Sequence, residues 1–345
     1  MQKYFVSEVY KEEAFTAGVV NQHIEQWLLS FGYKPLRYFF KRNNVPFIKI
    51  LRLIQVLYWA YSIPRNSMVL FHVPVIPRAS LFFLKVLKRR NYFTVALVHD
   101  LDGLRFADLS VLIKEKEVIG HFQHIILHNE RMQNFVGSFY PIKQISLLVL
   151  FDYYSSSPHF IERKLCKTIA LAANLQKANY LNDEFLLWLK KNSTLTVNIY
   201  GKKQAVDDES SLPRNLKLYG AVHPDLLPSS IEGSFGIVWD GNTITTCNSN
   251  LGEYLYYNTP HKLCLYLCAG LPVIVWEKSA MAKWVLENNV GITSSSWQDA
   301  IEKIEYTSND TYALWHKNAI EIGKKLRTGF YLKKVLRELE ELNRS

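Results

Sequence analysis

Three polar side chains with acid–base chemistry, His99, Asp100 and Asp102, directly follow the apolar run Phe93–Val98. If that run is a strand of a parallel sheet, its carboxyl end opens into the crevice where such sheets bind ligands. An imidazole or carboxylate placed there can act as a general base, and Arg105 could orient Asp102 or a substrate phosphate. Asp100 and Asp102 also form an Asp-x-Asp pair, which could hold a divalent metal ion. A loop- or helix-capping imidazole is the structural alternative for His99.

A second candidate site lies at the start of an apolar helix within residues Asn258–Val275. The sequence predicts Thr259 as the N-cap, Pro260 as the first helical residue and Gly270 as the closing residue, before a short buried strand. The amides and dipole at such a helix start attract anions. Lys262 in the first turn is unfavourable for the helix itself, so a bound anion such as a diphosphate explains it better. The alternative is a helix end that carries an ordinary surface lysine.

The elements that would position these residues alternate between apolar strands and amphipathic helices. The predicted strands are Tyr4–Val9, Met68–Phe71, Phe93–Val98, His124–Leu127, Ile145–Leu150, Thr168–Ala172, Leu195–Ile199, Leu216–Leu218, Phe235–Trp239 and Pro272–Val275. The predicted helices of the first half are Ala17–Leu29, Phe47–Tyr61, Ser80–Lys88 and Glu130–Val136. Such alternation is typical of α/β proteins with parallel, doubly wound sheets. With 345 residues and a Ser- and Tyr-rich linker at 153–158, the chain predicts two such domains.

Positive charge is concentrated in the first half of a chain whose net charge is +10. No Asp or Glu occurs between Glu25 and Asp100. The basic residues of this stretch are Lys34, Arg37, Lys41, Arg42, Lys49, Arg52, Arg65, Arg78, Lys85, Lys88, Arg89 and Arg90. Because aromatic and aliphatic residues are interleaved with them, the stretch predicts contact with an anionic membrane surface. A solvated basic face is the alternative, and no nucleic-acid-binding motif accompanies the charge.

The remaining composition predicts a cytoplasmic protein. The N-terminus lacks the pattern of a signal peptide, and the most apolar segment, Ile50–Ile63, is too short and too polar to span a bilayer. Four cysteines in a chain of this size fit no secreted disulfide framework. Cys264 and Cys268 are four residues apart, but no partner pair completes a zinc site, so both are expected to be packing residues.

The segment Asn258–Val275 resembles the nucleotide-binding helix of bacterial GT-B glycosyltransferases, whose pattern is roughly N-x-P-x-K, an apolar helix and A-G-x-P-V-I-V. Upstream, Phe235–Gly241 resembles the F-G-(L/I)-(I/V)-W-D of a narrower group. That group holds the β-1,6-galactofuranosyltransferases of O-antigen and capsule assembly and the related glucosyltransferases that modify bacterial adhesins. Further matches to the galactofuranosyl branch are residues 98–105, 151–153, 258–262 and 327–329.

The resemblance implies a GT-B fold of two Rossmann-like domains that face a central cleft. Residues 1–156 together with 327–345 would form the acceptor-side domain, and 157–326 would bind the nucleotide sugar. The amphipathic segment Phe330–Leu342 is expected to be a helix that returns to the first domain, with Gly329 near the crossing. The alternative is a helix that completes the core of the second domain.

The same resemblance implies roles for individual residues. Lys262, Asn174 and Lys177 would hold the donor pyrophosphate or ribose, although Ala173 stands where the family usually has Gly. Tyr219 follows a strand at the position where the nucleotide base usually lies. The other donor-side candidates are Asp240, Thr259 and His261, and the first-loop candidates for donor or acceptor contacts are Lys11 and Thr16.

We therefore expect transfer of galactofuranose from UDP-galactofuranose to a hydroxyl of a lipid-linked surface polysaccharide precursor. The product would be a β-galactofuranoside, β-1,6-linked as in the resembled family, formed with inversion and with Asp100 or His99 as the base. No metal cofactor is expected, because lysines and a helix start would neutralise the diphosphate. One alternative is a glucosyltransferase that uses UDP-glucose on a glycan or glycoprotein. The other is a non-catalytic membrane-surface module that has kept the fold. The protein is expected to be cytoplasmic and peripheral on the inner face of the plasma membrane. The sequence leaves open whether the chain forms a homo-oligomer.

Overall fold

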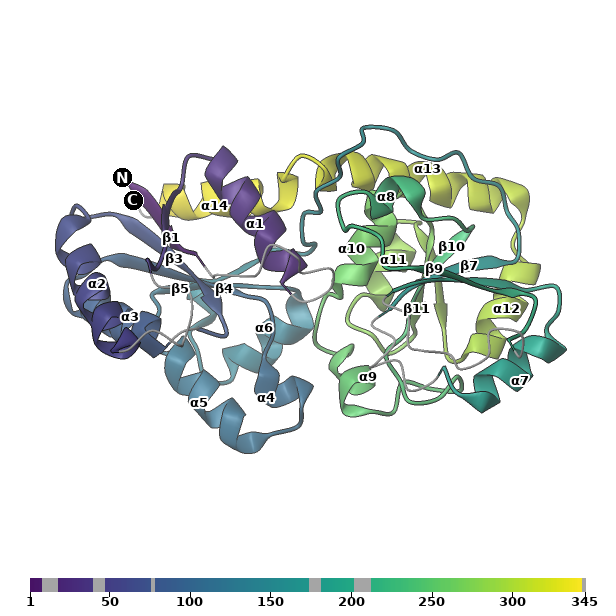
Figure 1. Cartoon of the computed structure of the whole chain (residues 1–345), viewed down its shortest axis with the longest axis horizontal. Helices are drawn as coiled ribbons and strands as arrows, with labels where there is room; N and C mark the ends of the chain where they lie inside the picture. The colour runs from purple at the N-terminus through teal and green to yellow at the C-terminus, as the bar shows by residue number, and fades with distance from the viewer. Residues whose placement is uncertain (8–17, 40–46, 76–77, 174–180, 202–211, 343–345) are drawn as a thin grey trace. The chain divides into compact units, whose positions relative to one another are not determined.

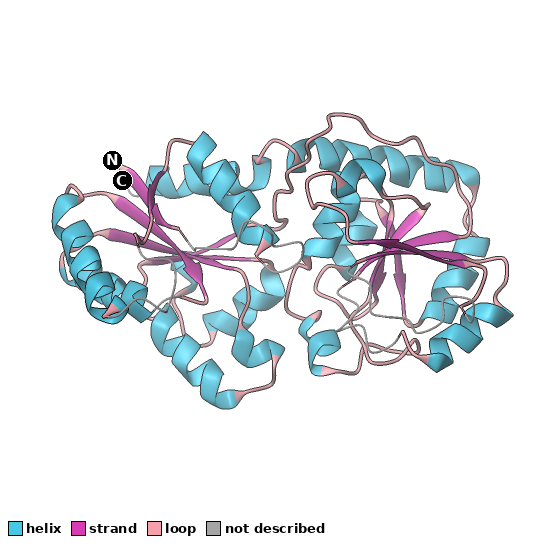
Figure 2. Ribbon diagram, in the orientation of Figure 1, coloured by secondary structure: helices cyan, strands magenta, loops and turns pink. Residues whose placement is uncertain are grey.

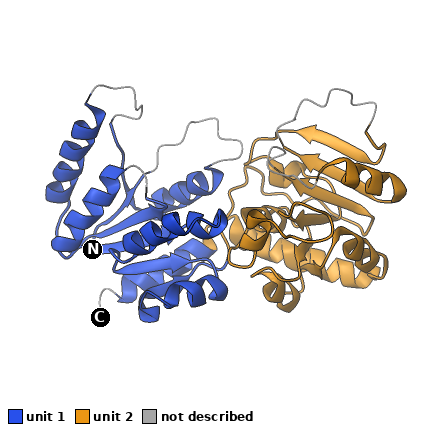
Figure 3. Cartoon of the chain, turned by 90° about the horizontal axis from the view of Figure 1, so that it is seen from below, with its two compact units in different colours: residues 1–14, 18–149, 331–345 blue, residues 15–17, 150–330 orange. Residues whose placement is uncertain are grey.

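The computed structural model describes residues 1–7, 18–39, 47–75, 78–173, 181–201 and 212–342. These residues form two compact units, shown in different colours in Figure 3. Of the described residues, 1–7, 18–149 and 331–342 belong to unit 1, and 150–330 belong to unit 2. The chain thus leaves unit 1 once and returns to it near its end.

Unit 1 is built on a six-stranded sheet in which every pairing is parallel. Its strands are β1 (Lys3–Val6), β2 (Lys34–Leu36), β3 (Met68–Val73), β4 (Phe93–Val98), β5 (His124–Leu127) and β6 (Ile145–Leu147). Their order is β2-β1-β3-β4-β5-β6. The strand order reverses between β1 and β3, and doubly wound sheets bind ligands beyond the carboxyl ends of the strands at such a switch point.

Helices cover both faces of this sheet. They are α1 (Val19–Ser30), α2 (Ile48–Ser62), α3 (Arg78–Arg89), α4 (Asp102–Arg105), α5 (Leu109–Ile119), α6 (Glu130–Gly137), the 3-10 helix η1 (Ile142–Gln144) and α14 (Phe330–Leu342). Figure 1 shows α1 and α14 on one side of the sheet and α4, α5 and α6 on the other. Asp108 and Asn129 cap α5 and α6, and each accepts two backbone N–H groups.

Unit 2 repeats the plan with a second six-stranded parallel sheet. Its strands are β7 (Thr168–Ala172), β8 (Thr196–Tyr200), β9 (Leu216–Gly220), β10 (Phe235–Val238), β11 (Val273–Trp276) and β12 (Gly291–Ser294). Their order is β12-β11-β10-β7-β8-β9, so the switch point lies between β7 and β10.

The helices of unit 2 also lie on both faces of its sheet, as the cyan ribbons of Figure 2 show. They are α7 (Asp183–Lys191), α8 (Leu227–Ser230), α9 (Asn250–Tyr254), α10 (His261–Cys268), α11 (Ala282–Glu287), α12 (Trp297–Glu305) and α13 (Asn309–Leu326). Asn182, Ser249, Ser296 and Ser308 cap α7, α9, α12 and α13. Helix α10 packs along α13 and against β10 and β11.

The predicted α/β architecture with two doubly wound sheets is confirmed. The strands Phe93–Val98, His124–Leu127 and Thr168–Ala172 match their predicted bounds. The prediction missed the short edge strands β2 and β12 and did not give α4 or α5.

The last helix, α14, packs in unit 1. Glu340 accepts hydrogen bonds from Lys3 on β1 at 2.7 Å and from Tyr33 at 3.4 Å. The apolar face of α14 is buried, and it consists of Leu332, Val335, Leu336 and Leu339. Gly329, with φ +70°, follows α13 and has the left-handed backbone that commonly ends a helix.

Arg327 stabilises the segment that precedes this turn. Its guanidinium donates to the Cys268 carbonyl at the end of α10 and to the carbonyls of Ser157 and His159, and it stacks over the Phe160 ring at 3.7 Å. A cation at a helix C-terminus is favourable for the helix dipole. The side chain therefore fastens the start of unit 2 to helices α10 and α13.

The four cysteines are free, and Cys247, Cys264 and Cys268 are buried. Within the described residues, none of the helices is both long enough and apolar enough to cross a bilayer.

Candidate active site

Unit 1 brings a row of polar side chains together at its switch point. Ser7 follows β1, His72 lies on β3 and His99 follows β4, whereas Glu25 projects from α1. The Ser7 hydroxyl donates to Glu25 at 2.7 Å, and the other Glu25 carboxylate oxygen lies 3.7 Å from Nε2 of His72. Nδ1 of His72 lies 2.6 Å from Nε2 of His99, and the two rings are stacked. A carboxylate and two imidazoles thus form a continuous chain of contacts.

The protonation of this chain follows from burial. The His72 ring is completely buried, and burial lowers its pKa to about 3, so it is neutral near pH 7 and carries one ring proton. A proton on Nε2 points toward the Glu25 carboxylate and leaves Nδ1 to accept from Nε2–H of His99. In the opposite tautomer of His72, Nε2 would direct a lone pair at the negative Glu25 carboxylate, and the two would repel each other. The favoured arrangement protonates His99 on Nε2 and leaves its Nδ1, a buried atom, without a proton.

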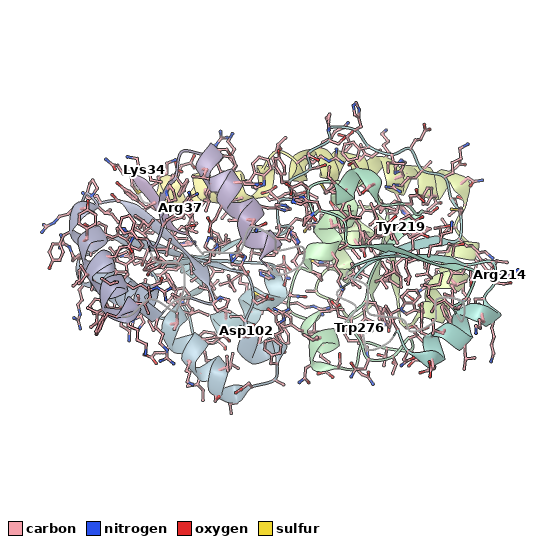
Figure 4. All side chains as sticks on the ribbon, viewed as in Figure 1. Lys34, Arg37, Asp102, Arg214, Tyr219 and Trp276 are labelled. Carbon is pink, nitrogen blue, oxygen red and sulfur yellow. The ribbon has the colours of Figure 1, made fainter. Side chains whose placement is uncertain are left out.

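The carboxylates that follow β4 have different partners from those expected. Arg105 donates to Asp100 at 2.5 Å, so it pairs with Asp100 rather than orienting Asp102. Asp102, labelled in Figure 4, begins α4, and its backbone N–H donates to Glu115 at 2.6 Å. Burial raises the pKa of Glu115, although the backbone N–H groups of Gly103 and Asp102 oppose that shift. Glu115 therefore holds the first turn of α4 next to His99.

Unit 2 places Lys262 and Asp240 in contact. Asp240 lies just beyond β10, and Lys262 lies in the first turn of α10. Nζ of Lys262 donates to Oδ1 of Asp240 at 2.6 Å, and both side chains keep partial contact with solvent. β10 borders the switch point of this sheet, so the ion pair lies where doubly wound sheets bind nucleotides.

The start of α10 differs from the prediction. Pro260 is the N-cap and His261 is the first helical residue, so the expected N-cap Thr259 was wrong. In the described structure no side chain caps this end. Thr259 is buried, and its hydroxyl donates to the sulfur of Met281. The His261 ring stacks on Tyr153, with ring centroids 4.7 Å apart.

The loop after β10 is folded around the Asp240 backbone. The Ser249 hydroxyl donates to the Asp240 carbonyl at 3.0 Å and also caps α9. The indole N–H of Trp239 donates to the Thr243 carbonyl at 2.8 Å. Burial raises the pKa of the Cys247 thiol in this loop to about 12, which leaves it protonated and unreactive.

Gly236 in the same motif is required for packing. A Cβ built on it would lie 2.2 Å from Cγ of Tyr266, whose ring on α10 covers β10. The Tyr266 hydroxyl in turn accepts the backbone N–H of Ala172 at the end of β7 at 2.8 Å. The close approach thus fixes α10, and with it Lys262, against both strands of the switch point.

Two buried polar atoms, one just before α10 and one just after β11, lack hydrogen-bond partners in the described structure. In the described part of the chain, Oδ1 of Asn258 and Oγ of Ser279 are buried without a hydrogen bond. Asn258 precedes α10, and Ser279 follows β11, the strand next to β10. Buried polar atoms are nearly always hydrogen-bonded in folded proteins, so such atoms are natural contacts for a polar ligand.

Tyr219 lies at the same carboxyl edge of the sheet, on β9, and is labelled in Figure 4. Its ring stacks on Tyr200 with centroids 4.7 Å apart, and its hydroxyl donates to Glu232 at 2.8 Å. Partial burial and this bond raise the pKa of Tyr219 to about 12. Three strand spacings, about 14 Å in total, separate β9 from β10, so Tyr219 does not contact the Lys262–Asp240 pair.

Four sequence-predicted site residues, Lys11, Thr16, Asn174 and Lys177, lie outside the described residues. Ala173, which directly precedes Asn174 in the chain, is buried just beyond β7. Among the described residues, no group of three or more His, Cys, Asp or Glu side chains could hold a metal ion.

Sequence reasoning missed Glu25, His72, Asn258 and Ser279. The signal for His72 was a single polar residue inside the otherwise apolar strand Met68–Val73. In the sequence, Glu25 stands out only as the last carboxylate before the stretch without Asp or Glu. Asn258 belonged to a recognised motif, but the motif alone could not show that its amide oxygen is buried.

Solved structures with the same architecture identify the fold. A sucrose-phosphate synthase from Thermosynechococcus elongatus superposes with a TM-score of 0.67 at 11% identity and covers 100% of both chains. Anabaena HepE in complex with UDP gives a TM-score of 0.65 at 10% identity over 99% of this chain and 100% of that one. Two doubly wound parallel sheets of this kind are the GT-B fold of glycosyltransferases.

Sequence comparison then gives the family. Residues 3–138 match the N-terminal domain of the glucosyltransferase 3-like proteins, and residues 169–339 match the C-terminal domain. The two matches span most of the chain, and the chain belongs to this glycosyltransferase family.

Curated relatives fall into two groups. The beta-1,6-galactofuranosyltransferase WbbI of Escherichia coli is 29% identical over 263 residues, which cover 75% of this chain and 73% of that protein. Glucosyltransferase 3 of Streptococcus parasanguinis is 30% identical over 128 residues, which cover 37% of each chain.

Proposed function

We propose that this glycosyltransferase moves a galactofuranosyl residue from UDP-galactofuranose to a hydroxyl of a lipid-linked glycan, forming a β-galactofuranoside. The Escherichia coli relative, which matches this chain over 73% of its own length, is a β-1,6-galactofuranosyltransferase. The donor nucleotide follows from HepE, a protein of the same fold whose structure contains UDP.

The observation that carries the proposal is the Lys262–Asp240 ion pair at the switch point of unit 2. The start of α10 offers backbone N–H groups and the positive end of a helix dipole to a donor diphosphate. Lys262 would then leave Asp240 for a phosphate oxygen. Its charge stabilises the departing UDP most strongly in the transition state, where the negative charge develops.

Other donor contacts follow from the same geometry. Asn258 and Ser279 present buried polar atoms without partners next to α10, and we assign them to the donor. Tyr219 would lie near the base, about 14 Å along the sheet edge from β10. Asn174 and Lys177 would complete the phosphate site, as the family resemblance implies.

On the acceptor side we assign the general base to His99. The Arg105 guanidinium neutralises the Asp100 carboxylate, whereas the chain from Glu25 through His72 supports a positive charge on His99. The base would take the proton of the acceptor hydroxyl as its oxygen attacks the anomeric carbon and UDP leaves. Attack from the face opposite UDP inverts an α-linked donor to a β-linked product.

A donor panel tests this function. We expect the purified protein to consume UDP-galactofuranose in the presence of a galactoside acceptor and to give a β-linked furanoside by NMR. UDP-galactopyranose is the matched control, since it differs only in the ring size of the sugar. Consumption of neither of these two UDP sugars nor of UDP-glucose would support a non-catalytic role.

The second candidate is transfer of glucose from UDP-glucose to a glycan or glycoprotein. It is supported by the match of both halves of the chain to the glucosyltransferase 3-like domains and by the Streptococcus relatives. Turnover of UDP-glucose at a kcat/KM above that of UDP-galactofuranose would establish it in place of the first.

A further inference from the structure

Helix α2 carries apolar residues on two opposite faces. Its inner face is buried: Gln55 donates to the Arg37 carbonyl at 2.8 Å, and the Trp59 ring contacts the rings of Tyr38 and Phe83. Val56 and Ala60 complete this face and are fully covered. The helix packs along α3, which Figure 1 shows beside it at the edge of unit 1. The interior of unit 1 therefore accounts for only one of the two apolar faces.

The opposite face is exposed, and we call it the outer stripe. It consists of Ile50, Leu53, Ile54, Leu57, Tyr58 and Tyr61. Their exposed fractions lie between 39% and 71%. The spacing i, i+3, i+4, i+7, i+8 and i+11 places all six side chains on one side of the helix. Soluble surfaces usually expose large apolar residues singly, so a continuous stripe of this length marks an interaction surface.

The charge around the outer stripe selects its partner. Neither α2 nor α3 contains an Asp or Glu. Arg90 lies over the Tyr61 ring at 4.4 Å, and Lys49 is exposed at the other end of the stripe. Lys88 and Arg89 are exposed at the end of α3, where the Lys88 ammonium also donates to the Gly120 carbonyl after α5. A second copy of the chain would bring the same positive rim against itself, and like charges repel. A surface that is both apolar and negative at its rim fits the stripe best.

We propose that the outer stripe of α2 binds the surface of an anionic lipid bilayer. The helix has 15 residues and is about 22 Å long, so it would lie in the plane of the membrane rather than cross it. Its aliphatic side chains enter the boundary between headgroups and acyl chains, where Tyr58 and Tyr61 keep their hydroxyls hydrated. Lys49, Lys88, Arg89 and Arg90 then face the lipid phosphates. Lys34 and Arg37, labelled in Figure 4, are also exposed on unit 1.

Vesicle flotation tests this surface without reference to any sugar transfer. The probe is a vesicle of phosphatidylcholine with phosphatidylglycerol, compared with pure phosphatidylcholine at low and high salt. We expect the wild-type protein to float with the anionic vesicles at low salt only. Reversal of the exposed pair Lys88→Glu and Arg89→Glu should weaken binding at least roughly thirtyfold, since each basic residue near the lipid contributes about 1 kcal/mol.

The outer stripe is tested by Ile54→Glu with Tyr58→Glu, which should abolish flotation. The matched control is Leu187→Glu with Leu286→Glu, because these residues of α7 and α11 have comparable exposure in unit 2. The control should float like the wild type. Hydrogen exchange of the unmodified protein supplies a readout without mutation, and vesicles should protect the peptide that covers 47–62.

Three outcomes would overturn the proposal. The first is a wild-type protein that does not float with anionic vesicles at low salt. The second is flotation that survives the Ile54 and Tyr58 substitutions, or a hydrogen-exchange experiment in which vesicles protect other peptides and not 47–62. The third is a dimer, measured by light scattering, that these substitutions convert to a monomer without any lipid binding, which would assign the stripe to a second copy of the chain.

Discussion

At the scale of single residues, both candidate sites pair a group suited to the reaction with a partner that restrains it. Lys262 is held by Asp240 within unit 2, and His99 is held by His72 and Glu25 within unit 1. Asp240 neutralises Lys262 until a phosphate oxygen takes its place, whereas His72 and Glu25 fix the geometry of His99 before a substrate arrives. This preorganisation removes part of the cost of assembling the transition state.

Lys262→Ala should lower kcat by about a hundredfold or more and leave the fold intact, because a charge-assisted contact to the departing diphosphate is lost. Steady-state kinetics and thermal unfolding measure both effects. The control is Lys283→Ala on α11, whose side chain is largely exposed. Wild-type turnover by a folded Lys262 variant would remove this residue from the site.

Glu25→Gln should lower kcat and move the acid limb of the pH–rate profile to lower pH. The carboxylate stabilises the protonated form of the imidazole pair, so its removal makes His99 easier to deprotonate but a weaker base. His72→Gln should act in the same direction. Glu117→Gln, an exposed carboxylate on α5, is the control. A fall in kcat with an unchanged profile would leave Glu25 with a structural role only.

Transfer should persist in EDTA, because Lys262 and the start of α10 supply positive charge to the diphosphate. The assay compares initial rates with and without the chelator, and then with Mg²⁺ or Mn²⁺ added back. Loss of activity that either ion restores would assign a metal to the site and revive the Asp100 and Asp102 pair as its ligands.

At the scale of helices and strands, the apolar pattern predicted the central elements well and the edges poorly. β4 and β5 are buried apolar runs, so their bounds could be read from the sequence. β2 contains only Lys34, Pro35 and Leu36, and β12 begins with Gly291, so neither edge strand shows the pattern of a buried one. α5 is apolar on several sides, because Leu109 and Ile113 are exposed, and this obscures the helical spacing of its buried apolar residues.

The candidate site was predicted where a motif encodes it and missed where packing creates it. The pattern around Lys262 and Asp240 is local in sequence, so the sequence alone predicts both residues. The contact between His72 and His99 joins residues 27 positions apart across neighbouring strands. Sheet order and burial decide such a contact, and a single sequence contains neither.

Gly236→Ala should destabilise unit 2 by about 1–3 kcal/mol, because the added methyl group would overlap the Tyr266 ring. Urea unfolding measures the loss. Donor binding should weaken as well, since the shifted α10 carries Lys262. Gly120→Ala is the control, because its Cβ would meet only ordinary contacts at 3.4 Å or more. Equal stability of both variants would contradict the packing role of Gly236.

At the scale of the whole molecule, three buried imidazoles make unit 1 sensitive to acid. Burial lowers the pKa of His72 to about 3 and those of His124 and His128 to about 4, from an ordinary value of 6.5. Between pH 6.5 and about 4 the unfolded chain therefore binds protons that the folded unit does not. Stability is complete above pH 6.5 and falls as the pH decreases.

The expected slope is about 1.4 kcal/mol per pH unit for each such histidine. Urea unfolding at several pH values measures it. His128→Gln keeps a donor for the Val98 carbonyl, and it should flatten the acid limb of the stability profile. His223→Gln, an exposed histidine, should leave the profile unchanged. A His128 variant with the slope of the wild type would show that its ring titrates normally in the folded protein.

The return of α14 to unit 1 has a consequence for the order in which the chain matures on the ribosome. The sheet of unit 1 is complete once residue 147 has been made, but α14, whose buried face includes Leu332, Leu336 and Leu339, is translated only after unit 2. The described residues of unit 2 are contiguous in sequence and end at residue 330. The unit that leaves the ribosome first therefore finishes folding only after the other has been made, and the apolar surface that α14 covers is exposed until then.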